Sequence, residues 1–393
     1  MIDRRHFVLL ASSSLSMLAL GKRSSAATDD ATVRAAVDDA MKPVIAQYGI
    51  PGMAVGVTLN GARHFVEYGS ASVKESVPAT RDTLFELGSI SKTFTATLAT
   101  LAETDGKLAL TDTVEQHMPE LAGSPIGAVR LLDLATHTAG GFPLQLPDAV
   151  KTGVQLIAYY RAWKSTFAAG TMRSYANPSI ALLGLVTARV LGDSFAKLAE
   201  GRLFPALGLK RTFINVPEAE RTSYAWGTNR DGEPVRAGAG PIAAEAYGVT
   251  SNAVDMLRYL EVQLDLLNKG AADGVAEPVA RAVVTTHTGY YRAGPFTQDL
   301  IWEQYLTSVT LHDMMAGNSP EISMKSNPAT AIEPPMAPRA DVVFNKTGST
   351  GGFGAYVVGA PEKKFGIVIL ANKFYPNRVR TKAAYRVMER LAG

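Results

Sequence analysis

Apolar residues near the start of the chain change their spacing from that of a helix to that of strands. Between residues 31 and 48 they recur every three to four positions, which predicts an amphipathic helix with Asp30 as its cap. Residues 53–59 and 64–68 are rich in β-forming side chains, and Asn60-Gly61 between them signals a two-residue hairpin. The chain therefore begins an α/β layer with a helix and a hairpin.

Helical spacing dominates the middle of the chain, and strand patterns return near its end. The predicted helices are 91–104, 129–137, 154–163 and 178–191, followed by strands 342–346, 356–359 and 365–370, a turn at 361–364 and a helix over 378–391. These patterns predict an α/β (α+β) fold in which both ends of the chain build one antiparallel sheet, flanked by helices, around a mostly helical insert. We expect an α/β domain of residues 28–85 and 205–393, a mostly helical domain of residues 86–204, and an active site at their junction.

The first 27 residues have the features of an export signal. Arg4-Arg5 precede an apolar run over residues 7–20, and Ser25-Ala26-Ala27 offers small residues at a cleavage point. Adjacent arginines followed by His6 further suggest the twin-arginine route. We therefore expect a periplasmic protein that is cleaved near Ala27.

Composition and charge narrow the classes of partner. The 393 residues are 47% hydrophobic and 19% charged, which suits a large globular core. The chain has 39 basic and 36 acidic residues, of which four basic residues and one acidic residue belong to the leader. The mature chain would therefore carry 35 of each. It has no excess of basic residues with which to bind nucleic acid or an anionic membrane surface. Cysteine is absent, and the six histidines are scattered without the spacing of zinc ligands. We expect no metal, no other cofactor, and a monomer that binds a small-molecule substrate.

Ser89 and Lys92 open the helical pattern at residue 91 and share one helical face. A lysine amine with a lowered pKa can take the proton of a serine hydroxyl, and the helix N-terminus adds positive potential where an oxyanion would develop. Alternatively, Ser89 only caps a helix and Lys92 is a solvated charge. The pattern is short, and Ser194 with Lys197 matches it too.

Two further motifs complete a serine-lysine site, and each occurs twice. Tyr-x-Asn occurs at Tyr175 and Tyr375, and Lys-Thr-Gly occurs at Lys151 and Lys346. Only Ser89, Tyr175 and Lys346 follow one another in the order Ser-x-x-Lys, Tyr-x-Asn, Lys-Thr-Gly. Lys346 also follows a β-rich run and precedes a glycine-rich stretch, where a ligand can approach the backbone.

At this point the chain resembles the class C serine β-lactamases, within the larger group of penicillin-recognising serine enzymes. The resemblance extends over residues 85–94, 140–145, 175–177, 213–217, 224–227, 244–249, 346–356, 370–373 and 375–377. It implies a β-lactamase/transpeptidase-like fold. Between residues 289 and 334 little family character remains beyond Gln298 and Trp302-Glu303, and Phe374 stands where the family commonly has asparagine. Both departures concern substrate preference.

The resemblance also implies a role for each residue of the reaction centre. Ser89 would attack the lactam carbonyl with Lys92 as first proton acceptor, and the backbone N–H groups of Ser89 and Ser349 would form the oxyanion hole. Tyr175, close to the ammonium groups of Lys92 and Lys346, should have a lowered pKa and would pass protons to the leaving nitrogen and from water. A buried, hydrogen-bonded tyrosine is the structural alternative.

A second set of residues would hold the substrate. By resemblance, Gln145 and Asn177 bind the side-chain amide, although they could instead stabilise loops. Lys346, Thr347 and Asn377 would face the substrate carboxylate, and Asn377 could equally cap the last helix. The remaining members of the set are Tyr247, which would form an apolar wall or only pack in the core, and Gly348 and Ser349.

The sequence thus predicts a serine hydrolase that opens the β-lactam ring of cephalosporins and penicillins through an acyl-enzyme and confers antibiotic resistance. A D-alanyl-D-alanine peptidase or a serine esterase would use the same residues. A penicillin-binding sensor, acylated without turnover, is a third possibility, and the absence of an anchor or added domain argues against it.

Overall fold

The computed structural model of the chain describes residues 29–393. The expected export leader over residues 1–27 lies outside this range. Within the described residues no single helix is long and apolar enough to cross a membrane, and one sharply bent pair, Asn177–Leu191 with Phe195–Ala206, passes that test by length and composition alone.

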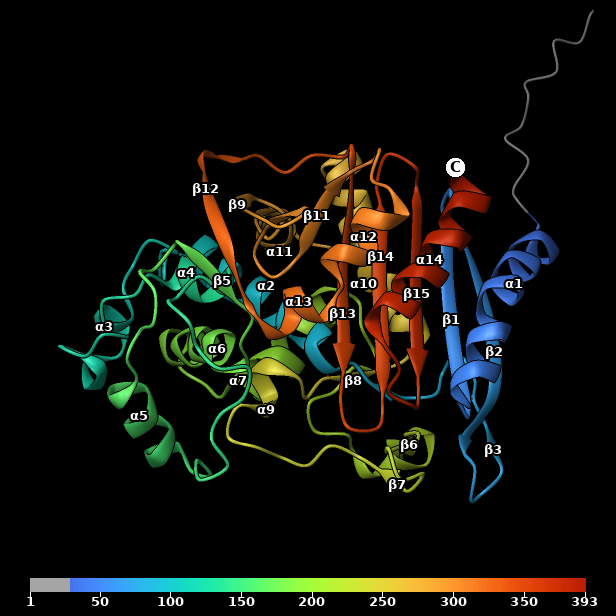
Figure 1. The fold of residues 1–393 in the computed structure, drawn as a ribbon, viewed down its shortest axis with the longest axis horizontal. Helices are drawn as coiled ribbons and strands as arrows, with labels where there is room; N and C mark the ends of the chain where they lie inside the picture. The colour runs from blue at the N-terminus through green and yellow to red at the C-terminus, as the bar shows by residue number, and fades with distance from the viewer. Residues whose placement is uncertain (1–28) are drawn as a thin grey trace, which may run out of the picture.

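Eleven strands of the described chain form one sheet, in which every neighbouring pair is antiparallel (Figure 1). In order across the sheet they are β3 (Val77–Pro78), β2 (Ala62–Ser72), β1 (Gly52–Leu59), β15 (Phe365–Ala371), β14 (Gly354–Ala360), β13 (Val342–Ser349), β11 (Glu303–Leu306), β10 (Phe296–Gln298), β9 (Gly289–Ala293), β12 (Ser326–Met336) and β5 (Met172–Ser174). Two small pairs lie outside it, β4 (Phe85–Glu86) with β8 (Thr250–Ser251) and β6 (Gly227–Thr228) with β7 (Pro234–Val235).

The two ends of the chain meet in the sheet as predicted. β1 pairs with β2 on one side and with β15 on the other. The hairpin between β1 and β2 turns at Asn60 and Gly61, which both have positive φ, as a tight two-residue turn requires.

Helices cover both faces of the sheet and form a second body of structure at its β5 end (Figure 1). They are α1 (Asp30–Tyr48), α2 (Ser91–Thr104), α3 (Val114–His117), α4 (Leu131–Ala135), α5 (Gly153–Ala162), α6 (Asn177–Leu191), α7 (Phe195–Leu198), α8 (Phe204–Ala206), α9 (Ala243–Ala246), α10 (Ala253–Lys269), α11 (Glu277–Thr285), α12 (Leu311–Gly317), α13 (Pro320–Met324) and α14 (Asn377–Ala392). Short 3-10 turns occur at Gly88–Ile90, Pro119–Leu121 and Glu218–Ser223, and a π-turn at Ala199–Leu203.

Alternation along β15 shows how the sheet separates two cores. Ile367 and Ile369 pack in one cluster with residues of α1 and α14, whereas Val368 and Leu370 pack in another with residues of α2 and α10. Successive side chains of a strand point to opposite faces, so a strand covered on both sides is apolar throughout. A third cluster joins α2 to α4, α5 and α6 and forms the interior of the mostly helical region.

Most predicted elements are present, with differences at their ends. α2 spans the predicted residues 91–104, but the helix predicted over 129–137 is confined to Leu131–Ala135. Asp30 was the wrong cap for α1, because the side chain of Asp29 accepts the hydrogen bond from the Thr32 N–H at 2.7 Å. The segment from 289 to 334, which has little family character, supplies β9, β10, β11 and most of β12 to the sheet and two short helices beside it.

Candidate active site

Close backbone contact places Ser89 against the sheet. Ser89 lies in the turn Gly88–Ile90 that leads into α2. Gly88 has φ +53°, and a Cβ there would lie 2.4 Å from the Ser349 nitrogen; a Cβ on Gly348 would lie 1.9 Å from the Leu87 carbonyl oxygen. Only glycine fits at both positions. The turn before α2 therefore lies directly on the end of β13, with Ser89 and Ser349 on adjoining backbone.

Lys92 lies one helical turn beyond Ser89 and is fully buried. Its Nζ donates to Ser89 Oγ at 2.8 Å and to the Ala246 carbonyl oxygen at 2.7 Å. Burial, against an opposing effect of Tyr175 and together with the nearby Lys346 ammonium, lowers the pKa of the Lys92 ammonium to about 8. The interpretation of Lys92 as a solvated charge is thereby wrong.

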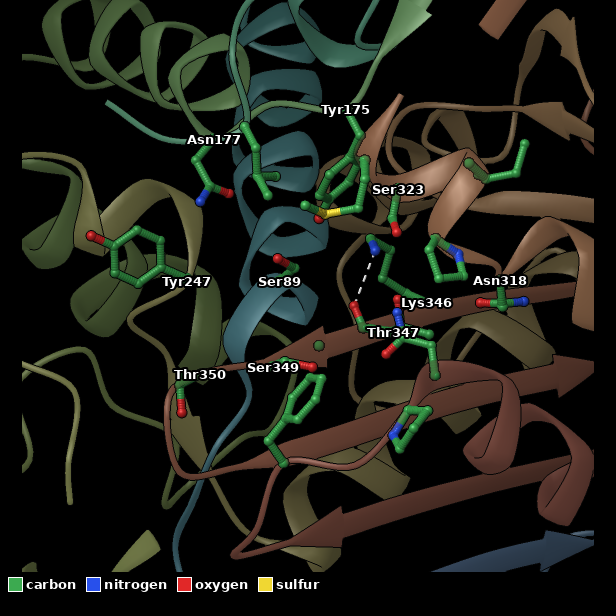
Figure 2. A pocket seen from close by; sticks show the side chains of 18 of the residues that line it. Ser89, Tyr175, Asn177, Tyr247, Asn318, Ser323, Lys346, Thr347, Ser349 and Thr350 are labelled. Atoms are coloured by element: carbon green, nitrogen blue, oxygen red, sulfur yellow. Dashed lines mark hydrogen bonds between the residues drawn. The ribbon is translucent and has the colours of Figure 1, made fainter. Parts of the chain in front are cut away.

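Tyr175 follows β5 and faces the same space as Ser89 and Lys346 (Figure 2). The Nζ atoms of Lys92 and Lys346 lie 5.3 and 5.0 Å from the centre of its ring. Burial by itself would raise the pKa of the phenol, but the two ammonium groups and a loose contact with Ser89 outweigh it and lower that pKa to about 8. The Tyr175 hydroxyl has no hydrogen-bond partner among the described residues, which disagrees with the structural alternative of a hydrogen-bonded core tyrosine.

The predicted residues line one pocket of about 860 Å³. Those on its wall are Ser89, Gln145, Tyr175, Asn177, Tyr247, Lys346, Thr347, Gly348, Ser349 and Asn377. Lys92 is not on the wall but contacts two residues that are, Ser89 and Tyr175. Asn177 Nδ2 donates to Gln145 Oε1 at 2.8 Å, so these two amides form a pair at the pocket wall. Asn377 is the first residue of α14 and Pro376 occupies the cap position, so Asn377 does not cap that helix and its side chain remains available to the pocket.

Two of the three duplicate motifs have structural roles elsewhere. Ser194 caps α7 by accepting from the Lys197 N–H, and the Lys197 side chain is exposed. Thr152, next to Lys151, forms a capping box with Gln155 at the start of α5. Chain order therefore separates Ser89 and Lys346 from Ser194 and Lys151, whereas the second Tyr-x-Asn copy also reaches the pocket through Pro376 and Asn377.

Sequence reasoning missed a buried ion pair beside Tyr175. Arg173, two residues before Tyr175 on β5, pairs with Glu303 at 2.8 Å and donates to the side chain of Gln298. Its guanidinium carbon lies 5.5 Å from the centre of the Tyr175 ring. Gln298 and Glu303 are two of the few residues with family character in the divergent segment, and their shared partner Arg173 gives a structural reason for their presence.

Two other parts of the pocket were also missed. Arg380 is buried on α14 and donates through Nη1 to the Gly348 carbonyl oxygen and to Ser349 Oγ at 2.9 Å, which supports the end of β13. The divergent segment adds a wall made of α12, α13 and their neighbours. Its pocket residues are Gly317, Asn318, Pro320, Ile322, Ser323 and Met324. No local sequence pattern marks them, because they reach the pocket through long-range packing.

The described residues contain no group of three or more His, Cys, Asp or Glu side chains placed to hold a metal ion. The pocket wall includes the Ser89 hydroxyl, the Lys346 ammonium, the Tyr175 phenol, several amides and the Arg173–Glu303 ion pair, and the Lys92 amine lies behind Ser89. Such a set can transfer an acyl group to serine and move protons around it.

Comparison with known proteins identifies the family of the chain. A family model described as Beta-lactamase matches residues 33–392. A β-lactamase of Pseudomonas fluorescens is 44% identical over 356 residues, which cover 91% of this chain and 98% of that protein.

Solved structures agree with the sequence comparison. A β-lactamase/D-alanine carboxypeptidase from Pseudomonas syringae is 45% identical with a TM-score of 0.87, over 91% of this chain and 98% of that one. A class C β-lactamase in complex with cefoxitin is 41% identical with a TM-score of 0.88, over 92% and 99%. The α/β fold with its β-lactamase-like arrangement is therefore confirmed. The chain belongs to the β-lactamase family, in its class C of serine enzymes.

Proposed function

We propose that this enzyme opens the β-lactam ring of cephalosporins and penicillins through an acyl-enzyme on Ser89, and that its expression confers resistance to these antibiotics. The observation that carries the assignment of the nucleophile is the 2.8 Å contact between Lys92 Nζ and Ser89 Oγ at the base of the pocket. Among the described residues this is where a serine meets a fully buried lysine with a pKa lowered to about 8.

Acylation begins with proton transfer from Ser89 to the neutral amine of Lys92. A lysine pKa of about 8 leaves a substantial neutral fraction near neutral pH, whereas an ordinary lysine pKa of 10.5 does not. Ser89 Oγ then bonds to the lactam carbonyl carbon, and the carbon–nitrogen bond of the ring breaks. Tyr175 returns a proton to the leaving nitrogen, so the acyl-enzyme forms without net loss of protons.

In deacylation Tyr175 accepts a proton instead of donating one. With a pKa of about 8, Tyr175 is deprotonated often enough to take a proton from water, whose oxygen attacks the ester carbonyl carbon. The ester bond to Ser89 breaks, and Ser89 Oγ takes back from the Lys92 ammonium the proton that Lys92 accepted during acylation, which restores the neutral amine and the protonated phenol. In both halves the carbonyl oxygen carries negative charge, which the backbone N–H groups of Ser89 and Ser349 stabilise. The close fit of Gly88 and Gly348 supports this pairing of N–H groups.

The pocket walls suggest how the substrate is oriented. Lys346, Thr347 and Asn377 line one part and would bind the substrate carboxylate by charge-assisted hydrogen bonds. The paired amides of Gln145 and Asn177 would bind the side-chain amide, with Tyr247 as an apolar wall.

A purified mature chain mixed with a chromogenic cephalosporin tests the function. We expect sustained turnover, and mass spectrometry with penicillin should find only a transient adduct on Ser89. One equivalent of cleavage followed by a stable adduct would favour the D-alanyl-D-alanine peptidase, an alternative supported by the name of the relative from Pseudomonas syringae. Cleavage of simple acyl esters without cleavage of cephalosporin would favour a serine esterase.

We also propose that the enzyme is exported to the periplasm, with cleavage near Ala27, and acts there as a monomer without a membrane anchor. Adjacent Arg4-Arg5, the apolar run and the small residues at Ser25-Ala26-Ala27 support export. N-terminal sequencing of protein from a periplasmic extract tests the cleavage site, and light scattering of the purified chain tests the monomer. A periplasmic protein that retains Met1, or a stable dimer, would contradict these proposals.

A further inference from the structure

His137 occupies an unusual backbone position beside the pocket. It lies two residues after α4, is 1% exposed, and has φ +60°. This left-handed conformation is uncommon for residues other than glycine, although histidine tolerates it better than most. Such strain persists only where the surrounding structure holds it, and it is found more often at functional sites.

Two hydrogen bonds connect His137 to the residues on either side of Tyr175. The Ser174 N–H donates to the His137 carbonyl oxygen at 2.8 Å, and the Ala176 N–H donates to His137 Nδ1 at 3.3 Å. The centre of the His137 ring also lies 4.5 Å from that of Tyr175, with 53° between the ring planes. One residue therefore holds the backbone before and after Tyr175 and contacts its ring.

The tautomer of His137 follows from these contacts. Because Nδ1 accepts a hydrogen bond, the proton of the neutral ring is on Nε2, which has no partner among the described residues. Burial lowers the pKa of His137 well below its usual value, and the cations of Arg173, Lys92 and Lys346 lower it further. His137 thus contacts Tyr175 and its backbone without adding a positive charge beside the phenol.

The Tyr175 hydroxyl has only loose contacts with Ser89 and Lys92, none of them a hydrogen bond among the described residues, so these contacts do not fix its direction. Its direction is set by its backbone and by what packs on its ring. We propose that His137 is the positioning residue that holds the Tyr175 hydroxyl in place for proton transfer. This inference rests on the proposed role of Tyr175.

Three variants separate the contacts of His137. His137→Asn keeps an acceptor at the place of Nδ1 and tolerates left-handed backbone, but it removes the ring. His137→Phe keeps a ring without an acceptor. His137→Gly tolerates the backbone conformation but has neither the ring nor the acceptor. It therefore tests the inference even if the Phe variant does not fold. His287→Asn is the matched control, because His287 is also buried, pairs with Gln263 and does not line the pocket.

The readout is kcat per folded molecule, with the folded fraction measured by circular dichroism, across pH. The charged and titratable groups around Tyr175 are Lys92 on α2, Lys346 on β13, Arg173 on β5 and Glu303 on β11, and none of them is altered. We expect His137→Gly and His137→Phe to lose about 10- to 100-fold in kcat, the scale of a misplaced catalytic group, with a displaced acidic limb of the pH profile. His137→Asn should recover a large part of the loss, and His287→Asn should change the melting temperature alone.

Wild-type kcat per folded molecule and an unchanged pH profile in all three His137 variants would overturn the inference. So would an Asn variant as impaired as the Gly variant. Tyr175→Phe is measured in parallel: a wild-type kcat there would remove the role of Tyr175 itself, whereas a large loss there combined with unaffected His137 variants overturns the positioning role alone.

Discussion

At the scale of single residues, the site is governed by cations placed around a phenol and an amine. Lys92, Lys346 and Arg173 all lie within 5.5 Å of the centre of the Tyr175 ring, and of these three only Arg173 has a carboxylate partner, Glu303, within residues 29–393. Burial, reinforced by the Lys346 ammonium, lowers the pKa of Lys92 to about 8, and the ammonium groups of Lys346 and Lys92 lower the pKa of Tyr175 to about 8 against the effect of burial. The two groups titrate as a coupled pair, so the pH dependence of turnover reports on both.

Lys346→Ala should therefore move the pH profile as well as weaken substrate binding. Removing its positive charge raises the pKa of Lys92 and of Tyr175, because Lys346 lowers both, and the acidic limb of kcat should shift to higher pH. For a substrate with a carboxylate we expect a loss of about 1.5–3 kcal/mol in kcat/KM, the value of a charge-assisted hydrogen bond. Steady-state kinetics across pH measure both effects. Lys151→Ala is the control, and equal losses in the two variants would mean that Lys346 does not face the substrate.

Two serines that share one motif should behave differently. Ser89→Ala should abolish turnover and the penicillin adduct, because it removes the attacking oxygen. Ser194→Ala should keep both and lose about 1 kcal/mol of stability, since Ser194 only caps α7. Intact mass after penicillin treatment and thermal unfolding distinguish the two. The assignment fails if Ser89→Ala still forms the adduct.

At the scale of elements, α9 brings a carboxyl group into the packing between α2 and α6. Glu245 is buried, and Thr95 of α2 donates to its carbonyl oxygen at 2.6 Å. A Cβ on Gly184 of α6 would lie 2.5 Å from Glu245 Cγ, so α6 approaches α9 closely only because residue 184 is glycine. The next two residues of the chain are Ala246, which accepts from Lys92, and Tyr247, which lines the pocket.

Glu245→Gln should make the enzyme more stable at alkaline pH. Burial raises the pKa of Glu245 from 4.5 to about 7, so between these values the folded protein holds a proton that the unfolded chain has lost. The stability present below pH 4.5 is thus lost as pH rises through 7, by up to about 3 kcal/mol at about 1.4 kcal/mol per pKa unit. Glutamine does not titrate. Thermal unfolding at pH 4.5 and pH 8 should show a gap between variant and parent only at the higher pH.

The exposed Glu218→Gln gives the matched control for that experiment. If the difference in stability between the parent and Glu245→Gln is the same at both pH values, Glu245 does not carry the buried proton.

The elements that sequence patterns predicted are those with long regular spacing. α2 and the strands β13 to β15 appear where periodicity placed them. The helix predicted up to residue 137 ends early, because Thr138 N–H donates to the Asp133 carbonyl oxygen and His137 adopts a left-handed backbone. Arg173 and Arg380 were missed because their partners are far away in sequence, and no local pattern reveals such pairs.

At the scale of the whole molecule, the first and last parts of the chain form one unit. Asn372, just after β15, accepts from the Gly52 N–H at 2.7 Å and donates to the Ser70 and Trp226 carbonyl oxygens at 2.9 and 3.1 Å. One buried amide thus joins β1, β2 and the segment before β6. We propose that residues 28–85 and 205–393 act as one domain around the helical domain of residues 86–204.

Asn372→Ala should destabilise the fold by about 2–4 kcal/mol, because it leaves several buried backbone groups without partners. Chemical denaturation measures the loss. Asn229→Ala in a neighbouring turn is a control, since the Asn229 side chain accepts only from exposed backbone N–H groups. A loss no larger for Asn372→Ala than for the control would contradict the role of Asn372 in joining the two ends of the chain.

Sequence alone predicted the union of both termini in one sheet, because hairpin and strand patterns at the two ends are strong. It did not predict that residues 289–336 extend the sheet and form a wall of the pocket. The strands β9, β10 and β11 have only five, three and four residues, too few to show a period. This segment and Phe374 are where substrate preference is expected to depart from that of relatives.

The most direct test of the central claim is a single-turnover measurement on Tyr175→Phe. The change removes the hydroxyl and keeps the ring, so packing with His137 is retained and the loss reports on proton transfer. With a good cephalosporin, stopped-flow absorbance and intact mass should show slower acylation followed by an adduct on Ser89 that persists much longer than in the parent. Steady-state turnover near that of the parent, with no accumulated adduct, would contradict the role of Tyr175 in both halves of the reaction.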